Sequence, residues 1–250
     1  MKIVILGFGK VARHLVRAFL SAEGVDEIQI YNRSVTNIPA GISFTTKLSE
    51  LIQAHVYIMA IPDDPIPGLS EKLPFENRLV VHTSGSVAMS RLSAKNRSGV
   101  FYPLQTFSKD HEVSFETIPI CLEATHAQDL KTLWDLGSFI SEKVVEINSE
   151  ERRKLHLAAV FVNNFTNHLY RISEEMIAEH HLDFDLLKPL ILETAHKIET
   201  LSPEEAQTGP AIRNDRKTME YHLELLANER YQEIYRTLTK SIQITHGKKL

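Results

Sequence analysis

The sequence predicts an α/β protein in which a mostly parallel sheet is followed by an all-α region. Short, unalternated runs of Val, Ile and aromatic residues recur through the first half of the chain, and helical spacing separates them. A glycine-rich segment joins the first of these runs to the first helix. Strand patterns then cease near residue 148, and long helical patterns fill the remainder. We therefore expect one domain over 1–148 and a second, helical domain over 149–250.

The expected strands are short and apolar on both sides, as in sheets that are covered on both faces. They are Ile3–Leu6, Glu27–Tyr31, Val56–Ile61, Leu79–His82, Gly99–Tyr102, Thr117–Leu122 and Lys143–Ile147. A helix over Val11–Ala22 separates the first two strands, and another over Ala127–Ile140 separates the last two. Strand–helix–strand repetition predicts parallel pairing with right-handed crossovers.

The second domain begins at a cap signal. Asn148 is followed by Ser149, Glu150 and Glu151, a short polar side chain with carboxylates in the first helical turn. The expected helices are Glu150–His180, Phe184–Leu201, Thr218–Leu226 and Glu229–Ser241, with a short helix or turn beginning at Pro203.

The bulk composition excludes several classes of protein. The chain has 250 residues, 43% of them hydrophobic, and 28 Lys+Arg against 32 Asp+Glu give a net charge of −4. Nucleic-acid and membrane-surface binding need clustered cations, which are missing, and no segment approaches the ~20 apolar residues of a membrane span. The single cysteine, Cys121, lies in an apolar run and is expected to be buried. A cytoplasmic location is expected.

The segment Gly7-Phe8-Gly9-Lys10-Val11-Ala12 follows the first strand and opens the first helix. It fits the G-x-G-x-x-A pattern of Rossmann domains. There the first glycine permits the turn, the second lets backbone approach a pyrophosphate, and the alanine allows close packing. A merely tight strand–helix turn is the alternative. The strand–turn–helix context favours dinucleotide binding by these six residues.

The end of the second strand selects the cofactor. NAD sites usually carry Asp or Glu here, whereas this chain has Asn32, Arg33 and Ser34. Arg33 can pair with a 2′-phosphate, and Asn32 and Ser34 can donate hydrogen bonds to it. The sequence thus favours NADP(H), although Arg33 can also be a solvated residue that stacks on adenine.

The next strand ends line the ligand crevice of a parallel sheet. Ala60, Ile61 and Pro62 are expected along the cofactor, and Thr83 and Ser84 near the nicotinamide. Ser84 can contact substrate or cofactor, or instead cap a helix.

The helix that begins near Glu150 carries the candidate chemistry. His156 and Asn163 share one of its faces, and Asn164 follows directly. His156 is the expected proton donor, and Asn163 or Asn164 would orient the substrate. His156 can alternatively be a polar residue satisfied at a domain interface.

Two further segments carry candidate substrate contacts. Gln105 and Thr106 follow a strand end, where they can fix polar substrate atoms or satisfy loop backbone. Arg213 follows the break at Gly209-Pro210; it can reach a partner's cleft in a dimer or pair with Asp215. The twelve histidines show no metal-ligand spacing, so no metal site is expected.

These motifs resemble those of one family. The segments that carry the likeness are Gly7–Ala12, His82–Ser86, Tyr102–Phe107, His156–Phe165 and Thr208–Gly209–Pro210 with Arg213 and Asp215. The chain resembles the Rossmann-like NADP oxidoreductases that carry a helical C-terminal domain of unknown function. These are distant relatives of pyrroline-5-carboxylate reductase, ketopantoate reductase and deazaflavin-dependent NADP oxidoreductase. The resemblance implies the fold, the cofactor class and a homodimer formed through the helical domain, but no reaction.

The leading hypothesis is an NADP(H)-dependent oxidoreductase that acts on a small, unidentified carbonyl, imine or alcohol. Related hydroxyacid dehydrogenases pair a Lys with an Asn four residues later, whereas Lys154 here is followed by Ala158. A non-catalytic NADP-binding sensor or interaction protein is therefore an alternative. A reductase of a flavin or deazaflavin is a third.

Overall fold

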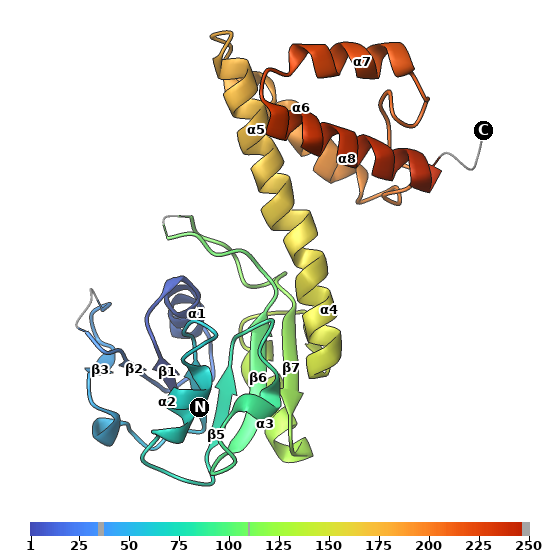
Figure 1. Cartoon of the computed structure of the whole chain (residues 1–250). Coiled ribbons are helices and arrows are strands. Elements are labelled where there is room, and N and C mark those ends of the chain that lie inside the picture. The colour runs from blue at the N-terminus through green and yellow to red at the C-terminus, as the bar shows by residue number, and fades with distance from the viewer. Residues whose placement is uncertain (35–37, 110, 247–250) are drawn as a thin grey trace. The chain divides into compact units, whose positions relative to one another are not determined.

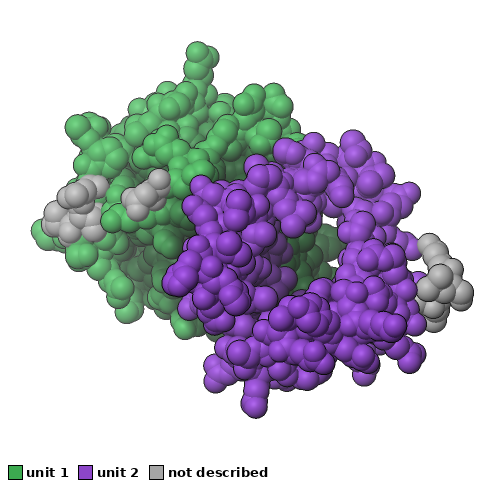
Figure 2. Space-filling model, turned by 90° about the horizontal axis from the view of Figure 1, so that it is seen from above, with its two compact units in different colours: residues 1–165 green, residues 166–250 purple. Residues whose placement is uncertain are grey.

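The computed structural model describes residues 1–34, 38–109 and 111–246. The chain divides into two compact units, Met1–Phe165 and Thr166–Leu250, which Figure 2 shows in different colours.

The first unit is built on an eight-stranded sheet with the order β3-β2-β1-β4-β5-β6-β7-β8 (Figure 1). All neighbouring strands are parallel except β6 and β7, which are antiparallel. The mostly parallel sheet predicted from the sequence is thereby confirmed. The strands are β1 (Lys2–Leu6), β2 (Glu27–Tyr31), β3 (Ser43–Thr45), β4 (Val56–Met59), β5 (Leu79–His82), β6 (Arg97–Pro103), β7 (Ile120–Ala124) and β8 (Val144–Glu146).

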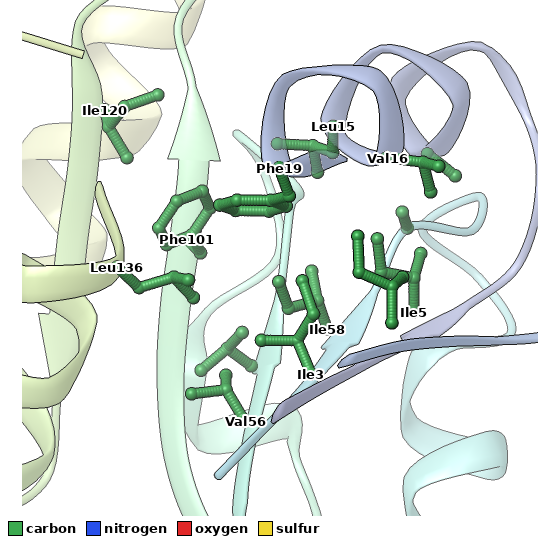
Figure 3. Packing of buried hydrophobic residues seen from close by; sticks show 14 of the residues in the cluster. Ile3, Ile5, Leu15, Val16, Phe19, Val56, Ile58, Phe101, Ile120 and Leu136 are labelled. Carbon is green, nitrogen blue, oxygen red and sulfur yellow. The ribbon is translucent and has the colours of Figure 1, made fainter. Parts of the chain in front are cut away.

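Helices cover both faces of this sheet, because its strands are apolar on both sides. They are α1 (Lys10–Leu20), α2 (Ile66–Glu71), α3 (Ala127–Ser138) and α4 (Ser149–Ala159), with the short 3₁₀ turns η1 (Leu48–Glu50) and η2 (Met89–Arg91). On one face, Leu15 and Phe19 of α1 pack over Ile3 and Ile58 of the sheet (Figure 3). Phe19 also meets Phe101 of β6, with ring centroids 6.0 Å apart.

The opposite face carries two smaller apolar clusters. Tyr57 and Met59 of β4 pack with Ile66 of α2 in one of them. In the other, Tyr102 of β6 packs with Leu155 of α4. Because side chains alternate along a strand, Phe101 points to the α1 face and Tyr102 to the α4 face. This alternation brings Tyr102 to the helix that carries the candidate chemistry.

Helix α4 begins as the sequence predicts. The Asn148 side chain accepts hydrogen bonds from the backbone N–H groups of Glu150 and Glu151, at 2.9 and 3.0 Å. The Glu151 carboxylate accepts one in return from the Asn148 N–H, at 2.9 Å, which completes a capping box. After Ala159 the helix widens into a π-helical turn, η3 (Val160–Phe165).

The secondary-structure elements described in the second unit are all helical, and loops connect them. They are α5 (Thr166–Ala178), the 3₁₀ turn η4 (Phe184–Leu186), α6 (Lys188–Lys197), α7 (Arg216–Leu225) and α8 (Glu229–His246). Many large apolar side chains on these elements are exposed, among them Leu190, Tyr221 and Leu225. None of the helices in the described part of the chain is long and apolar enough to cross a membrane.

Some sequence expectations differ from the structure in extent. The predicted helix Glu150–His180 contains the π-helical turn, and the predicted helix Phe184–Leu201 ends at Lys197. The three-residue strand β3 was not predicted. The predicted domain boundary at residue 148 follows the last strand, whereas the compact units divide after Phe165, so α4 and η3 belong with the sheet.

Candidate active site

A cavity of about 430 Å³ lies at the carboxyl ends of β1, β2 and β4. Gly7 follows β1 with φ +103°, a conformation that L side chains rarely adopt. A β-carbon at this position would stand 2.5 Å from the Ile61 side chain and 2.6 Å from the Ala60 carbonyl oxygen. The turn out of β1 therefore requires glycine, and its close approach to the end of β4 shapes the cavity.

The N-terminus of α1 opens beside the same cavity. Gly9 is the N-cap residue, and no side chain caps the first helical N–H groups. A β-carbon on Gly9 would meet no atom within 4 Å, so the space above it is open. Unpaired N–H groups beside open space suit the oxygens of a pyrophosphate. This geometry fits a dinucleotide.

The end of β2 supplies the polar rim of this cavity. Asn32 and the exposed Arg33 line it, and no Asp or Glu is among its described lining residues. The Asn32 amide donates a hydrogen bond to the Ser34 backbone carbonyl at 2.9 Å, which shapes the loop that presents Arg33. Lys72, just after α2, lines the cavity as well. The sequence analysis missed Lys72, because no motif links it to the distant Arg33.

The predicted cofactor residues divide into two sets. The cavity brings together eight of them: Gly7, Phe8, Gly9, Asn32, Arg33, Ala60, Ile61 and Pro62. Lys10, Val11, Ala12, Ser34, Thr83 and Ser84 are not among its lining residues. Of these, Ala12 is fully buried and packs in the core beneath the loop, as the close-packing argument requires.

Hydrogen bonds between its own polar groups hold the loop after β5 in place. The Ser84 hydroxyl accepts hydrogen bonds from the backbone N–H groups of Ser86 and Val87, at 3.1 and 3.0 Å. The Ser84 N–H in turn donates to Nδ1 of His82 at 3.2 Å. Burial, followed by the positive charge of Arg152, lowers the pKa of His82 to about 4, so its ring is neutral near pH 7. The Ser84 hydroxyl thus organises this loop, and it does not cap η2, whose N-cap residue is Ala88.

Arg152 fastens α4 to the sheet and to this loop. Its side chain is completely buried and pairs with the Glu123 carboxylate of β7. It also donates to the Val87 carbonyl oxygen and, at 3.2 Å, to the Ser149 hydroxyl. A buried guanidinium with three fixed partners sets the position of α4 along the sheet.

A second cavity, of about 490 Å³, lies beside α4 within the first unit. Its polar lining comes from the loop after β6, from α4 and from the π-helical turn. The lining residues that the sequence analysis singled out are Gln105, Thr106, His156, Asn163 and Asn164, and Tyr102 lines the cavity as well. Candidate catalytic and substrate-binding residues from two distant parts of the chain therefore line the same cavity.

Two aromatic side chains that line this second cavity, Tyr102 and His156, contact each other. The hydroxyl Oη of Tyr102 lies 3.0 Å from Nδ1 of His156, and the two rings meet edge to face. Burial raises the pKa of Tyr102 to about 12. Gly85, in the loop after β5, also lies against the imidazole: a β-carbon there would be 2.6 Å from Nδ1. His156 thus contacts the loop at which the nicotinamide is expected.

The π-helical turn carries two successive asparagines that line this cavity. In an α-helix neighbouring residues point about 100° apart, whereas a π-helical turn is wider and distributes more residues over each turn. Asn163 and Asn164 lie in η3 and both contribute to the lining. Such turns occur frequently at functional sites.

Arg213 belongs to the second unit and is not among the residues that line this cavity. Its side chain is exposed, and no ion pair joins it to Asp215 among the described residues. Asp215 instead caps α7, where its carboxylate accepts hydrogen bonds from the Thr218 hydroxyl at 2.7 Å and backbone N–H at 3.2 Å. These bonds lower the pKa of Asp215.

Two chemistries have no support at either cavity. Among the described residues, no group of three or more His, Cys, Asp or Glu side chains is arranged to hold a metal ion. Cys121 is buried, and burial raises the pKa of its thiol to about 11, which disfavours the reactive thiolate. The sequence prediction of a buried thiol is thus confirmed.

Comparisons with known proteins agree with this architecture. The chain is similar to a Bacteroides fragilis protein described as an NADP oxidoreductase, with 38% identity, coverage of 96% of this chain and 97% of that one, and a TM-score of 0.86. A Thermotoga maritima protein is 21% identical over 98% of each chain, with a TM-score of 0.74. No curated protein matches the chain.

A more distant likeness concerns the fold alone. Plasmodium falciparum pyrroline carboxylate reductase, solved with NADP bound, is 10% identical, with coverage of 97% of this chain and 98% of that one and a TM-score of 0.64. The resemblance inferred from the motifs, an NADP oxidoreductase-like chain with a helical C-terminal region of unknown function, is confirmed. A family described as a domain of unknown function (DUF2520) matches residues 118–242, and this chain belongs to that family.

Proposed function

We propose that this protein is an NADP(H)-dependent oxidoreductase that acts on a small carbonyl, imine or alcohol substrate in the cavity beside α4. The observation that carries the proposal is the contact between His156 and Gly85. It joins the cavity beside α4 to the loop after β5, where a Rossmann domain presents the nicotinamide. The likeness to the Bacteroides fragilis protein described as an NADP oxidoreductase supports the same class.

The residues that would hold the cofactor follow from the first cavity. The uncapped N-terminus of α1 beyond Gly9 suits the pyrophosphate, and Arg33 and Lys72 provide cations for a 2′-phosphate. Ala60, Ile61 and Pro62 form the apolar wall of the cavity. When bound, NADPH supplies a hydride equivalent to the carbon of a C=O or C=N bond.

The second cavity supplies the polar groups that such a reduction needs. The oxygen or nitrogen of the reduced bond must gain a proton, and His156 is the group we assign beside it. Asn163 would orient the substrate through its side-chain amide, and Gln105 and Asn164 would bind further polar atoms. Ser84 would contribute by organising the loop after β5, and Arg213 stays a proposed substrate-binding residue.

The cofactor assignment is tested by titrating NADPH and NADH into the wild type and Arg33→Ala. We expect Arg33→Ala to weaken NADPH binding by roughly tenfold to a hundredfold, because a charge-assisted contact to the 2′-phosphate is lost. NADH binding should stay nearly constant. Lys131→Ala, which removes an exposed cation from α3, is the matched control. Equal losses for both cofactors would contradict a 2′-phosphate contact.

Turnover is tested by following NADPH absorbance against a library of small ketones, aldehydes and imines. His156→Ala and Asn163→Ala should each reduce turnover while NADPH affinity is kept, because neither residue lines the first cavity. Tight NADPH binding without turnover of any substrate would favour the NADP-binding sensor. Turnover of flavins or deazaflavins alone would favour the cofactor reductase.

We also propose that the protein forms a homodimer through its helical unit. The support is the exposed apolar surface of α6 and α7, where Leu190, Tyr221 and Leu225 are 63%, 58% and 63% exposed. Protein–protein interfaces typically bury such exposed apolar side chains.

A further inference from the structure

Tyr102 and His156 form a hydrogen bond, and the residue that donates its hydrogen can be assigned. The two polar atoms, Oη and Nδ1, are 3.0 Å apart, and the ring planes meet at 76°. Either atom can donate, depending on the tautomer of the imidazole. The choice decides which nitrogen of His156 carries a proton, and hence what the cavity offers to a ligand.

The surroundings of Tyr102 decide the direction of this bond. The residue is only 8% exposed, and burial raises the pKa of its hydroxyl to about 12, so the hydroxyl keeps its proton near pH 7. A buried O–H group needs an acceptor. Within the described residues, Nδ1 of His156 is the hydrogen-bond partner that the structure gives to Oη. The hydroxyl therefore donates to Nδ1, and the proton of the neutral imidazole is on Nε2.

Nδ1 is also closed to any ligand. Gly85 packs so tightly against it that a β-carbon there would stand 2.6 Å away, and Tyr102 occupies its lone pair. His156 nevertheless lines the cavity of about 490 Å³. Nε2 is thus the nitrogen that His156 presents to a ligand, and it presents an N–H donor.

We propose that Tyr102 is a positioning residue that holds His156 with its proton on Nε2, and that the cavity consequently selects substrates whose reducible group accepts a hydrogen bond. Ketones, aldehydes and uncharged imines have such a lone pair. A protonated iminium has none on its nitrogen and offers only a donor. This inference rests on the proposed function, because it specifies the substrate class of the same site.

The tautomer can be measured without turnover. In the full-length protein, ¹⁵N signals of the histidine rings distinguish a protonated nitrogen from a bare one, and His156→Gln identifies the signals of His156 by their loss. We expect Nε2 of His156 to be protonated in the wild type at pH 8. We expect Tyr102→Phe to give a mixture of both tautomers. A proton on Nδ1 in the wild type, or an unchanged tautomer in Tyr102→Phe, would overturn the proposal.

The second unit provides a matched control. His222 and Tyr235 form a pair of the same kind, with Nδ1 and Oη 2.9 Å apart and rings at 86°. Tyr235→Phe should change the ring signals of His222 and leave those of His156 as they are. A response of His156 to Tyr235→Phe would show that the signals report general disturbance, which would also overturn the assignment.

The substrate class is tested with two ligands of the same ring size, added to the protein with NADP⁺ present. Cyclohexanone carries only an acceptor, and cyclohexylammonium carries only donors. We expect cyclohexanone to shift the Nε2 signal of His156, and to do so much less in Tyr102→Phe. Cyclohexylammonium should produce no shift at Nε2. An equal response to both ligands, or to neither, would contradict the proposed selection.

Kinetic measurements distinguish a positioning role of Tyr102 from general damage to the fold. Once a substrate is known, Tyr102→Phe should lower kcat by roughly tenfold to a hundredfold, as expected for a misplaced catalytic group, with the Kd for NADPH unchanged. A parallel loss of kcat and NADPH affinity would indicate damage to the fold and would overturn the positioning role. If no substrate is turned over while the tautomer result stands, the proposed function fails and the assignment of the proton does not.

Discussion

The backbone of Gly85 lies against the imidazole of His156, so closely that a β-carbon on Gly85 would stand 2.6 Å from Nδ1 and 2.7 Å from Cγ. The two residues come from the loop after β5 and from α4. Their contact leaves no room for a side chain at residue 85, and it makes the orientation of the imidazole depend on that loop.

Gly85→Ala should therefore displace His156. Because the same imidazole is also held by its hydrogen bond to Tyr102, a shift of the ring would disturb that bond, and we expect a destabilisation of about 1–3 kcal/mol. Thermal or urea unfolding measures this change. In a His156→Ala background the same substitution should cost much less, because the obstructing ring is gone. Equal costs in both backgrounds would contradict a direct contact.

Lys72→Ala should weaken NADPH binding selectively. Lys72 is exposed where it lines the first cavity, so its contribution to a 2′-phosphate contact is screened by solvent. We expect a loss of roughly two- to fivefold for NADPH and none for NADH. Isothermal titration at low and high salt measures it, and the effect should shrink at high salt. Loss of NADH affinity to the same extent would remove Lys72 from the phosphate subsite.

His82 should make the stability of the protein depend on pH. Its folded-state pKa of about 4 lies below the ordinary value of 6.5, so between these values the unfolded chain binds the proton more readily. The contribution of the neutral His82 ring to the free energy of unfolding is therefore at its full value above about pH 6.5. It declines as the pH falls towards 4, by at most about 3 kcal/mol in total.

Urea unfolding between pH 4.5 and 7.5 measures this decline. His82→Asn removes the titrating ring and keeps an acceptor for the Ser84 N–H, so its stability should fall less steeply over the same range. Carboxylates with lowered pKa values, such as Asp215, destabilise both proteins alike at low pH. Identical pH profiles for the two proteins would exclude His82 as the source.

Arg152→Met should destabilise the protein strongly. It removes a completely buried guanidinium and leaves the Glu123 carboxylate, which is only 15% exposed, without its cation. We expect a cost of about 3–5 kcal/mol in urea unfolding. Lys154→Ala, two residues along the same helix, breaks an ion pair with Glu150 that is largely exposed, and it should cost less than about 0.5 kcal/mol. Similar costs for the two variants would mean that Arg152 anchors nothing.

Leu190→Glu should disrupt the proposed homodimer. A carboxylate in the centre of an apolar interface must lose its hydration, which costs several kcal/mol. Sedimentation velocity should then detect monomers at concentrations where the wild type is dimeric. Thr200→Glu introduces the same charge at an exposed polar position of the same unit and should leave the dimer intact. A monomeric wild type would end this proposal.

The sequence was sufficient for the parts of this molecule that follow local rules. The turn at Gly7 and the cap at Asn148 could be predicted, because each depends on a few adjacent residues. Strand β3 was missed, because three residues give too little periodicity to recognise.

The site was predictable in its residues and not in its geometry. Arg152 is flanked by Glu151, Arg153 and Lys154, and this run of charges predicts a solvent-exposed helix face. The side chain of Arg152 is nevertheless buried. Its burial depends on Glu123, which is distant in the sequence. The meeting of Tyr102 with His156 likewise depends on which face of β6 Tyr102 occupies and on the packing of α4 against that face, and both are fixed only by the assembled sheet.

The π-helical turn at Val160–Phe165 gives this cavity an unusual sensitivity to chain length. A π-helical turn holds one more residue than the α-helical turn it replaces. Deleting a single residue there would rewind the helix and rotate Asn163 and Asn164 relative to His156, although every polar side chain of the cavity would be retained. The selectivity of the cavity can therefore change when residues of one helix rotate about its axis, although no side chain that lines the cavity is substituted.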